Sequence, residues 1–155
     1  MIRIGTGYDV HRLVPERRLV LCGVEIPSDL GLLGHSDADV AVHALMDAIL
    51  GALAMGDIGK LFPDSDPQYK GADSMKLLAE VIRQMEGAGF RLGNLDLTII
   101  AERPKLAKHI PAMRESLAAA FGCDISQVSV KATTEEGLGL AGAGIGAHAV
   151  VLLEK

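Results

Sequence analysis

The sequence predicts an α+β fold in which a mixed β-sheet is covered on one side by three helices. Two observations carry this prediction. Apolar residues alternate in several short segments, which is typical of strands, and recur at helical spacing in three longer ones. The predicted order is strands, two helices, a strand, a helix and two strands, for which a mixed sheet layered by helices is the economical architecture. A chain of 155 residues has the size of one domain, so we expect a single domain over residues 1–155.

The first 26 residues are predicted to form strands. Residues 2–11 alternate weakly and are bounded by Gly5 and Gly7, which indicates a first strand. Residues 18–23 and 24–26 predict two short strands around a turn.

The first helix is predicted to follow Ser36, where the spacing of apolar residues changes. Ser36 or Asp37 can cap this helix, and Gly56 follows it. Its apolar stripe consists of Val40, Ala41, Ala44, Leu45, Ala48, Ile49 and Ala52.

The remaining chain predicts an acidic loop, two further helices and three strands. The loop is expected at 57–69, because this stretch contains two prolines, a glycine and three aspartates. The last helix is expected to begin at Pro111, because proline is favoured at the first position of a helix, and to stop at Gly122. The predicted ranges are 74–86 and 111–121 for the helices, and 92–101, 128–132 and 147–153 for the strands.

Composition excludes several classes of protein. The 15 Lys and Arg residues against 20 Asp and Glu residues give a net charge of −5, and only three Phe, two Tyr and no Trp are present. No basic stripe with aromatic platforms exists, so we expect no nucleic-acid partner. No run of about 18 apolar residues occurs, so we expect no membrane partner. Cys22 and Cys123 stand apart without a CxxC motif, and no signal or transit segment is recognised, so a cytoplasmic location is expected.

Histidines and aspartates gather in the first 47 residues in a pattern that suits a metal. Asp9 and His11 are two apart on a predicted strand and share a face, while His43 and Asp47 are four apart on a predicted helix. Asp9, His11 and His43 would supply three ligands to a divalent ion such as Zn²⁺ and leave a fourth position open. Asp47 is expected to orient the His43 imidazole. The alternative is that the helix residues form a solvated face and that His11 lies in a turn.

Two motifs near the C-terminus have competing interpretations. Residues 137–142 match GxGxxG, but only thirteen residues follow, too few for a dinucleotide-binding unit, so a tight loop or a close subunit contact is favoured. Thr133, Thr134, Glu135 and Glu136 end a predicted strand. They can bind phosphate and share a Mg²⁺ with it, or they can form a helix-cap-like turn.

Together these segments resemble the 2-C-methyl-D-erythritol 2,4-cyclodiphosphate synthases, a family of the non-mevalonate isoprenoid pathway. The resemblance covers essentially the whole chain. It is carried by GYDVHRL at 7–13, GLLGHSDADVAVHALMDAILGA at 31–52, GDIGKLFPDSDPQYKGADS at 56–74, TIIAERPKL at 98–106 and VKATTEEGLG at 130–139.

The resemblance implies an activity and a role for each matching residue. The family is a phosphorus–oxygen lyase that converts 4-diphosphocytidyl-2-C-methyl-D-erythritol 2-phosphate to the 2,4-cyclodiphosphate and releases CMP. By this resemblance Asp9, His11 and His43 bind zinc, and Glu136 binds the Mg²⁺ or Mn²⁺ that accompanies the diphosphate. His35 and Thr134 are the expected catalytic residues. The expected substrate-binding residues are Ser36, Asp57, Ile58, Gly59, Phe62, Pro63, Asp64, Ser65, Asp66, Ala101, Glu102, Arg103, Pro104, Lys105, Leu106, Ala107, Thr133, Thr134, Glu135 and Glu136.

The resemblance also implies a homotrimer whose active sites are shared between chains. Some family members have an Arg, associated with an anion site on the trimer axis, where this chain has Ala143, so this chain lacks that charge. Two other functions stay open at this point. A metal-dependent phosphohydrolase could use the same three metal ligands, and a non-catalytic oligomeric scaffold could use the glycine-rich tail.

Overall fold

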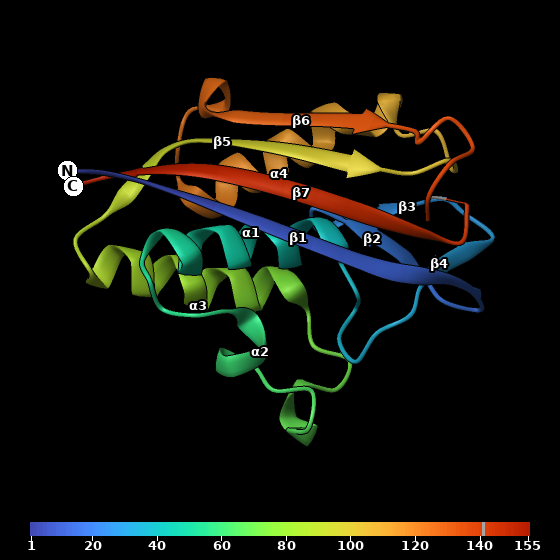
Figure 1. Ribbon diagram of the computed structural model, residues 1–155, viewed down its shortest axis with the longest axis horizontal. Coiled ribbons are helices and arrows are strands. Elements are labelled where there is room, and N and C mark those ends of the chain that lie inside the picture. Colours follow the sequence, from blue (N-terminus) through green and yellow to red (C-terminus); the bar gives the residue numbers. More distant parts are fainter. Residues whose placement is uncertain (141) are drawn as a thin grey trace.

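The computed structural model describes residues 1–140 and 142–155 (Figure 1). The motif at 137–142 includes residue 141, so it lies partly outside the described residues. Within the described residues, one sheet has the strand order β4-β1-β7-β5-β6 and a separate hairpin pairs β2 with β3. The strands are β1 (Ile2–Pro15), β2 (Leu19–Leu21), β3 (Val24–Ile26), β4 (Leu30–Leu32), β5 (Arg91–Ile100), β6 (Val128–Thr133) and β7 (Gly144–Glu154).

The sheet is mixed, as predicted. β1 and β7 pair antiparallel in an unbroken register from Ile2 opposite Glu154 to Arg12 opposite Gly144. β5 pairs antiparallel with β7 and parallel with β6. A backbone hydrogen bond also joins Lys155 N–H to the Met1 carbonyl, so both chain ends lie together at one end of the sheet (Figure 1).

Three main helices cover one face of this sheet, which confirms the predicted α+β class (Figure 1). They are α1 (Val40–Ala52), α3 (Ser74–Gly87) and α4 (Ile110–Phe121). Shorter helical segments are α2 (Ile58–Leu61), η1 (Pro67–Tyr69), η2 (Ala107–His109) and η3 (Ile125–Gln127). No helix in the described part of the chain is long and apolar enough to cross a membrane.

Helix α1 lies directly against the backbone of β1 because two strand residues lack side chains. A Cβ on Gly5 would lie 1.9 Å from the Ala48 carbonyl oxygen, and one on Gly7 would lie 1.9 Å from the Ala44 carbonyl oxygen. Gly5 and Gly7 therefore lie within β1. The prediction that they bound the strand was wrong. The close approach brings the first turns of α1 next to the middle of β1.

The start of α1 differs from the prediction. The cap is Asp39, whose carboxylate accepts a hydrogen bond from Val42 N–H at 3.1 Å. The same fully buried carboxylate accepts from the N–H groups of Cys22 and Gly23, at 3.0 and 2.8 Å, and so ties the β2–β3 turn to the helix. Spacing alone could not choose Asp39 over Ser36 and Asp37, because all three residue types favour the cap position and the bonds to Cys22 and Gly23 are distant in the sequence.

Two segments were missed. β4 pairs with the end of β1, and the acidic stretch 57–69, predicted as a loop, contains α2 and η1. Both short helices are capped by aspartates of that stretch, because Asp57 accepts from Lys60 N–H and Asp66 accepts from Gln68 N–H. The loop chemistry that was recognised therefore acts partly as helix capping.

Candidate metal centre

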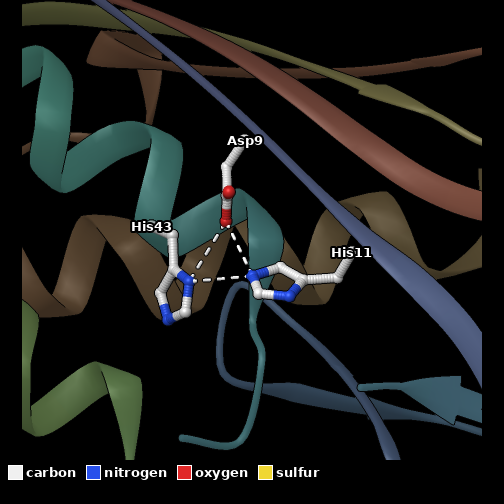
Figure 2. Close-up of side chains that lie close together, drawn as sticks. All are labelled: Asp9, His11 and His43. Atoms are coloured by element: carbon white, nitrogen blue, oxygen red, sulfur yellow. Dashed lines mark hydrogen bonds and ion pairs between the residues drawn. The ribbon is translucent and has the colours of Figure 1, made fainter. Parts of the chain in front are cut away.

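Three side chains converge where α1 crosses β1. Asp9 and His11 leave the same face of β1, and His43 reaches them from the first turn of α1 (Figure 2). The distance from Asp9 Oδ2 to His11 Nε2 is 2.9 Å, and that to His43 Nδ1 is 3.1 Å. The two imidazole nitrogens are 3.3 Å apart. One oxygen and two nitrogens thus form a nearly regular triangle.

The triangle has a suitable size for a small divalent ion. Ligand atoms at about 2.0–2.1 Å from a tetrahedral zinc ion lie roughly 3.3 Å from one another. The observed separations of 2.9 to 3.3 Å need only a small expansion to reach this value. One carboxylate and two imidazoles also form a typical donor set for such an ion, with a fourth position left for a ligand. Asp9, His11 and His43 therefore fit a divalent metal.

The two histidines face the triangle through different ring nitrogens. His11 Nδ1 lies 2.8 Å from the Leu33 carbonyl, which can only accept, so this nitrogen carries the proton and Nε2 is free to bind metal. His43 has the opposite arrangement, because its Nδ1 faces Asp9 and its Nε2 faces two serine hydroxyls. Both imidazoles are thus oriented by a hydrogen bond on the far side of the ring.

The charges in the triangle favour an ionised carboxylate. Burial opposes ionisation of Asp9, but the hydrogen bonds with His11 and His43 outweigh it and lower the pKa of Asp9 from 3.8 to about 2. The hydrogen bond with Asp9 raises the pKa of His11, although its partial burial acts in the opposite direction. The raised pKa of His11 favours a proton on His11 beside the Asp9 carboxylate, whose charge a bound cation would otherwise compensate.

A cavity of about 210 Å³ opens beside the three ligands. It brings together six other residues that the sequence analysis assigned to substrate or catalysis: His35, Ser36, Ile58, Gly59, Phe62 and Asp64. His35 Nε2 donates to the Asp66 carbonyl at 3.2 Å, and the Phe62 and Tyr69 rings meet edge to face. The cavity is therefore walled by α2 and by the segment after it. Met46, Tyr69 and Leu77 also line it and were not predicted.

Asp47 has a different partner from the one expected. Its carboxylate accepts a hydrogen bond from Ile58 N–H at 2.8 Å, at the beginning of α2. Burial raises the pKa of Asp47, and the hydrogen bond from Ile58 opposes the rise. Its contact therefore positions α2, while the outer nitrogen of His43 faces Ser36 and Ser74.

The second group of predicted residues lies at the ends of β5 and β6. Ala101 N–H donates to the Thr133 carbonyl at 2.9 Å, so the segments 101–107 and 133–136 are neighbours. The Glu102 carboxylate accepts from the N–H groups of Glu135 and Gly137, and Thr134 Oγ1 accepts from Glu136 N–H. None of the residues from these two segments lines the cavity at the metal ligands, and β7 and β5 lie between β1 and β6. One chain thus presents two separate groups.

Two residues near the metal ligands were not predicted to belong to the site. Asp37 and Ser74 are hydrogen-bonded to one another and lie behind His43. Asp37 was considered only as a helix cap. No periodic signal connects it with Ser74, because they are 37 residues apart.

Fold and site together define a class of protein: an α+β chain with a candidate three-ligand metal site at the mouth of a cavity. Comparison with known proteins specifies the family. A family model described as the YgbB family matches residues 2–154. The chain is 64% identical, over 154 residues and 98% of each sequence, to the 2-C-methyl-D-erythritol 2,4-cyclodiphosphate synthase of Trichlorobacter lovleyi. The chain therefore belongs to the YgbB family.

Solved structures agree with this assignment. A 2C-methyl-D-erythritol-2,4-cyclodiphosphate synthase in a form bound to CDP matches with a TM-score of 0.92 and 44% identity, over 98% of this chain and 100% of that one. The bifunctional IspDF from Campylobacter jejuni matches with a TM-score of 0.95 and 42% identity, over 99% of this chain. This chain spans only 42% of that bifunctional protein.

Proposed function

We propose that this chain is a 2-C-methyl-D-erythritol 2,4-cyclodiphosphate synthase, a phosphorus–oxygen lyase. It converts 4-diphosphocytidyl-2-C-methyl-D-erythritol 2-phosphate to the cyclic diphosphate and CMP. The names of full-length relatives support the proposal. The structural observation that carries it is the triangle of Asp9, His11 and His43 beside a cavity lined by His35, Ser36 and α2.

The reaction places few demands on a protein nucleophile. An oxygen of the substrate's own 2-phosphate forms a bond to the β-phosphorus, and the bond from this phosphorus to the oxygen of the CMP phosphate breaks. CMP leaves with the electron pair. The protein must hold two anionic groups together and stabilise the developing charge. A zinc ion, when bound at Asp9, His11 and His43, supplies Lewis-acid stabilisation of phosphate oxygens.

The cavity suits the erythritol and the attacking phosphate. His35 and Ser36 hold the 2-phosphate, and Asp57 and Gly59 hold the erythritol hydroxyls. The segment 62–66 covers the substrate. His35 Nε2 donates to the Asp66 carbonyl, so this covering segment is attached to the residue that contacts phosphate. The hydrogen bond from Ile58 N–H to Asp47 holds α2 at the cavity wall.

The nucleotide and the diphosphate bind at the other group of residues. Segment 101–107 forms the cytidine pocket, and Thr133, Thr134 and Glu135 bind the diphosphate. Glu136 binds the accompanying Mg²⁺ or Mn²⁺. The hydrogen bonds from Glu135 and Gly137 N–H to Glu102 support this arrangement, because they hold the two segments against each other.

We further propose a homotrimer in which each active site uses two chains. The metal ligands lie on β1 and α1, whereas the nucleotide residues lie beyond β5 and β6. A ring of three chains places one group of each subunit against the other group of its neighbour. The sheet face opposite the helices supports an interface, since Ile4 and Tyr8 of β1 are 70% and 58% exposed there. Ala143 supplies no charge for an anion on the trimer axis. A cytoplasmic location stays a prediction from the sequence.

Phosphorus NMR of the diphosphocytidyl substrate, incubated with the protein, Zn²⁺ and Mg²⁺, tests the proposal. We expect the signals of the cyclic diphosphate and CMP to appear in equal amounts. An open-chain phosphate product would show that water attacks, which identifies a phosphohydrolase instead. If the substrate stays unchanged although the protein binds metal, a non-catalytic role is favoured.

A further inference from the structure

We propose that Asp37 and Ser74 are positioning residues that fix the tautomer of His43, so that its Nδ1 is available to a metal ion. The inference deepens the proposed function, because it rests on the same metal site. It follows from three contacts behind the His43 ring: the bond from Ser74 to Asp37, and the contacts of Ser74 and of Ser36 with His43 Nε2.

The first step is the direction of the bond between Ser74 and Asp37. The Asp37 carboxylate accepts from three groups: the Ser74 hydroxyl, Ser74 N–H at 3.0 Å and Asp39 N–H at 3.1 Å. A carboxylate with these three donors has no proton to give, so the proton of the Ser74 hydroxyl points to Asp37. Asp37 N–H itself donates to the Ala72 carbonyl at 3.0 Å, which keeps the segment in place.

The second step concerns the contact between Ser74 and His43. Ser74 Oγ lies 3.1 Å from His43 Nε2. The only proton of this hydroxyl is already directed to Asp37, so Oγ can only accept. His43 Nε2 must therefore carry the proton of the neutral imidazole, and the Nδ1 lone pair faces the position between Asp9 and His11 that a metal ion would take.

The third step separates Ser74 from Ser36, which approaches the same nitrogen. Ser36 Oγ also lies 3.1 Å from His43 Nε2 and accepts from Ala38 N–H. The proton of the Ser36 hydroxyl is not committed by that bond, so Ser36 can either donate to Nε2 or accept from it. The Ser36 hydroxyl can therefore form a hydrogen bond with either tautomer of His43. The Ser74 hydroxyl, whose proton is directed to Asp37, can form one only with the Nε2–H tautomer.

The opposite tautomer has a favourable partner and must be suppressed. With its proton on Nδ1, His43 would donate to Asp9 Oδ2 at 3.1 Å and would have no lone pair for a metal. Ser74 is fully buried and His43 is 8% exposed, so no water relieves the contact between Ser74 Oγ and Nε2, and Ser36 is the remaining side chain that can donate to this nitrogen. The alternative would leave two lone pairs facing each other at Ser74 Oγ and His43 Nε2, which is costly in a buried site.

The test compares Ser74→Ala with Ser36→Ala, which each remove one hydroxyl at the same distance from the same nitrogen. Two-bond ¹⁵N–¹H correlation spectra of the metal-free protein report the tautomer of neutral His43. We expect the Nε2–H form in the wild type and in Ser36→Ala. In Ser74→Ala we expect the Nδ1–H form to become populated, because Asp9 then attracts the proton.

Zinc affinity, measured by competition with a chelator, gives the second readout. Loss of such supporting bonds typically weakens metal binding about 10–100-fold, which we expect for Ser74→Ala and Asp37→Asn. Asp73→Asn is the control for charge, since Asp73 caps the same helix and contacts only Met75 N–H among the bonds found for its carboxylate. We expect Asp73→Asn and Ser36→Ala to stay close to the wild-type affinity.

Equal losses in the two serine variants, or an unchanged tautomer in Ser74→Ala, would overturn the inference. Thermal unfolding of each variant shows whether it is folded, and Asp37→Asn provides an independent test if Ser74→Ala is not. If the wild-type protein binds zinc but forms no cyclic product, the proposed function is refuted and the positioning role is not. A tautomer that follows Ser74 would then still support the positioning role.

Discussion

The α-carbon of Gly7 faces the carbonyl oxygen of Ala44 so closely that a Cβ at position 7 would lie 1.9 Å from that oxygen. The contact sets the distance between the strand that carries Asp9 and His11 and the helix that carries His43. Three metal ligands from two elements can form one triangle only while this distance is kept.

Gly7→Ala is therefore expected to separate α1 from β1. Overpacking of this kind costs about 1–3 kcal/mol or more in free energy of unfolding, and zinc affinity should fall with it. Gly51→Ala, on α1 near the same contact, is the matched control. A Cβ on Gly51 would have the Thr6 carbonyl oxygen as its nearest neighbour, at 3.8 Å. We expect Gly51→Ala to stabilise the protein by about 0.5–1 kcal/mol. Urea unfolding and chelator competition check both; equal behaviour of the two variants would contradict the argument.

His43→Ala should release the metal, because only two protein ligands would remain. Elemental analysis of the purified variant measures this. Asp47→Asn serves as the control one helical turn away: its carboxylate contacts Ile58 N–H, so we expect metal content to stay near that of the wild type and KM for the substrate to rise. Metal loss in Asp47→Asn comparable to that in His43→Ala would mean that Asp47 is a ligand.

Asp39 predicts a pH dependence of stability. Burial raises the pKa of Asp39 from 3.8 to about 6, although hydrogen bonds from Gly23, Val42 and Cys22 N–H oppose the rise. Because the folded pKa lies above the unfolded one, the contribution is fully present below pH 3.8 and is lost as pH rises through about 6. At about 1.4 kcal/mol per pKa unit, the change amounts to at most roughly 3 kcal/mol.

The stability difference between Asp39→Asn and the wild type isolates this contribution. Asparagine does not titrate, so relative to the wild type the variant should gain stability between pH 4 and pH 6, whatever constant offset the substitution adds. Urea unfolding of the metal-free proteins at fixed concentration measures the difference. An offset that stays constant over this pH range would show that Asp39 remains ionised throughout.

His35→Ala and Thr134→Ala should lower turnover while metal content stays near that of the wild type. Both side chains are proposed to act on phosphate oxygens, and loss of one such donor typically costs about 2.7–4 kcal/mol of barrier. Single-turnover rates together with elemental analysis test this. A variant that loses its metal would show that the residue belongs to the metal site.

Shared sites predict complementation between two inactive variants. Asp9→Ala and Thr134→Ala chains should each be nearly inactive, yet randomly mixed trimers should regain about a quarter of the sites, because each site needs an intact Asp9 and an intact Thr134 from neighbouring chains. The two proteins are unfolded together and refolded, with wild type treated in the same way as the control. If the wild type recovers and the mixture does not, each chain contains a complete site.

Much of the fold could be predicted because its helices and strands follow local sequence patterns. The helix from Ser74 and the strand near Leu95 follow apolar periodicity, and Gly122 ends α4 with φ of 62° as its position suggested. Asp9 and His11 could be paired because residues two apart on a strand share a face. Spacing also suggested His43 as the third ligand, but the contact itself depends on the approach of α1 to Gly7, which no local pattern shows.

The missed contacts share a physical origin. Ser36 and Asp37 looked like helix caps because serine and aspartate favour that position. In the folded chain they bind His43 and Ser74, and Asp39 caps α1 instead. Partners that are distant in sequence compete for the same side chains, and a local pattern does not show which partner wins. The same reason applies to Asp47, whose neighbour on the helix was His43 but whose bond goes to Ile58.

The long antiparallel ladder between β1 and β7 has a consequence for how the protein acquires its metal. Asp9 and His11 stand opposite Ala147 and Ile145 within this ladder, and its backbone bonds involve no ion. We therefore expect the scaffold, unlike a zinc finger, to fold without the metal. On this expectation, a folded metal-free form would persist during metal starvation and would bind metal again without new synthesis. Which divalent ion it then takes depends on the supply of competing ions as well as on the ligands, because intrinsic affinities follow a fixed order among the transition metals.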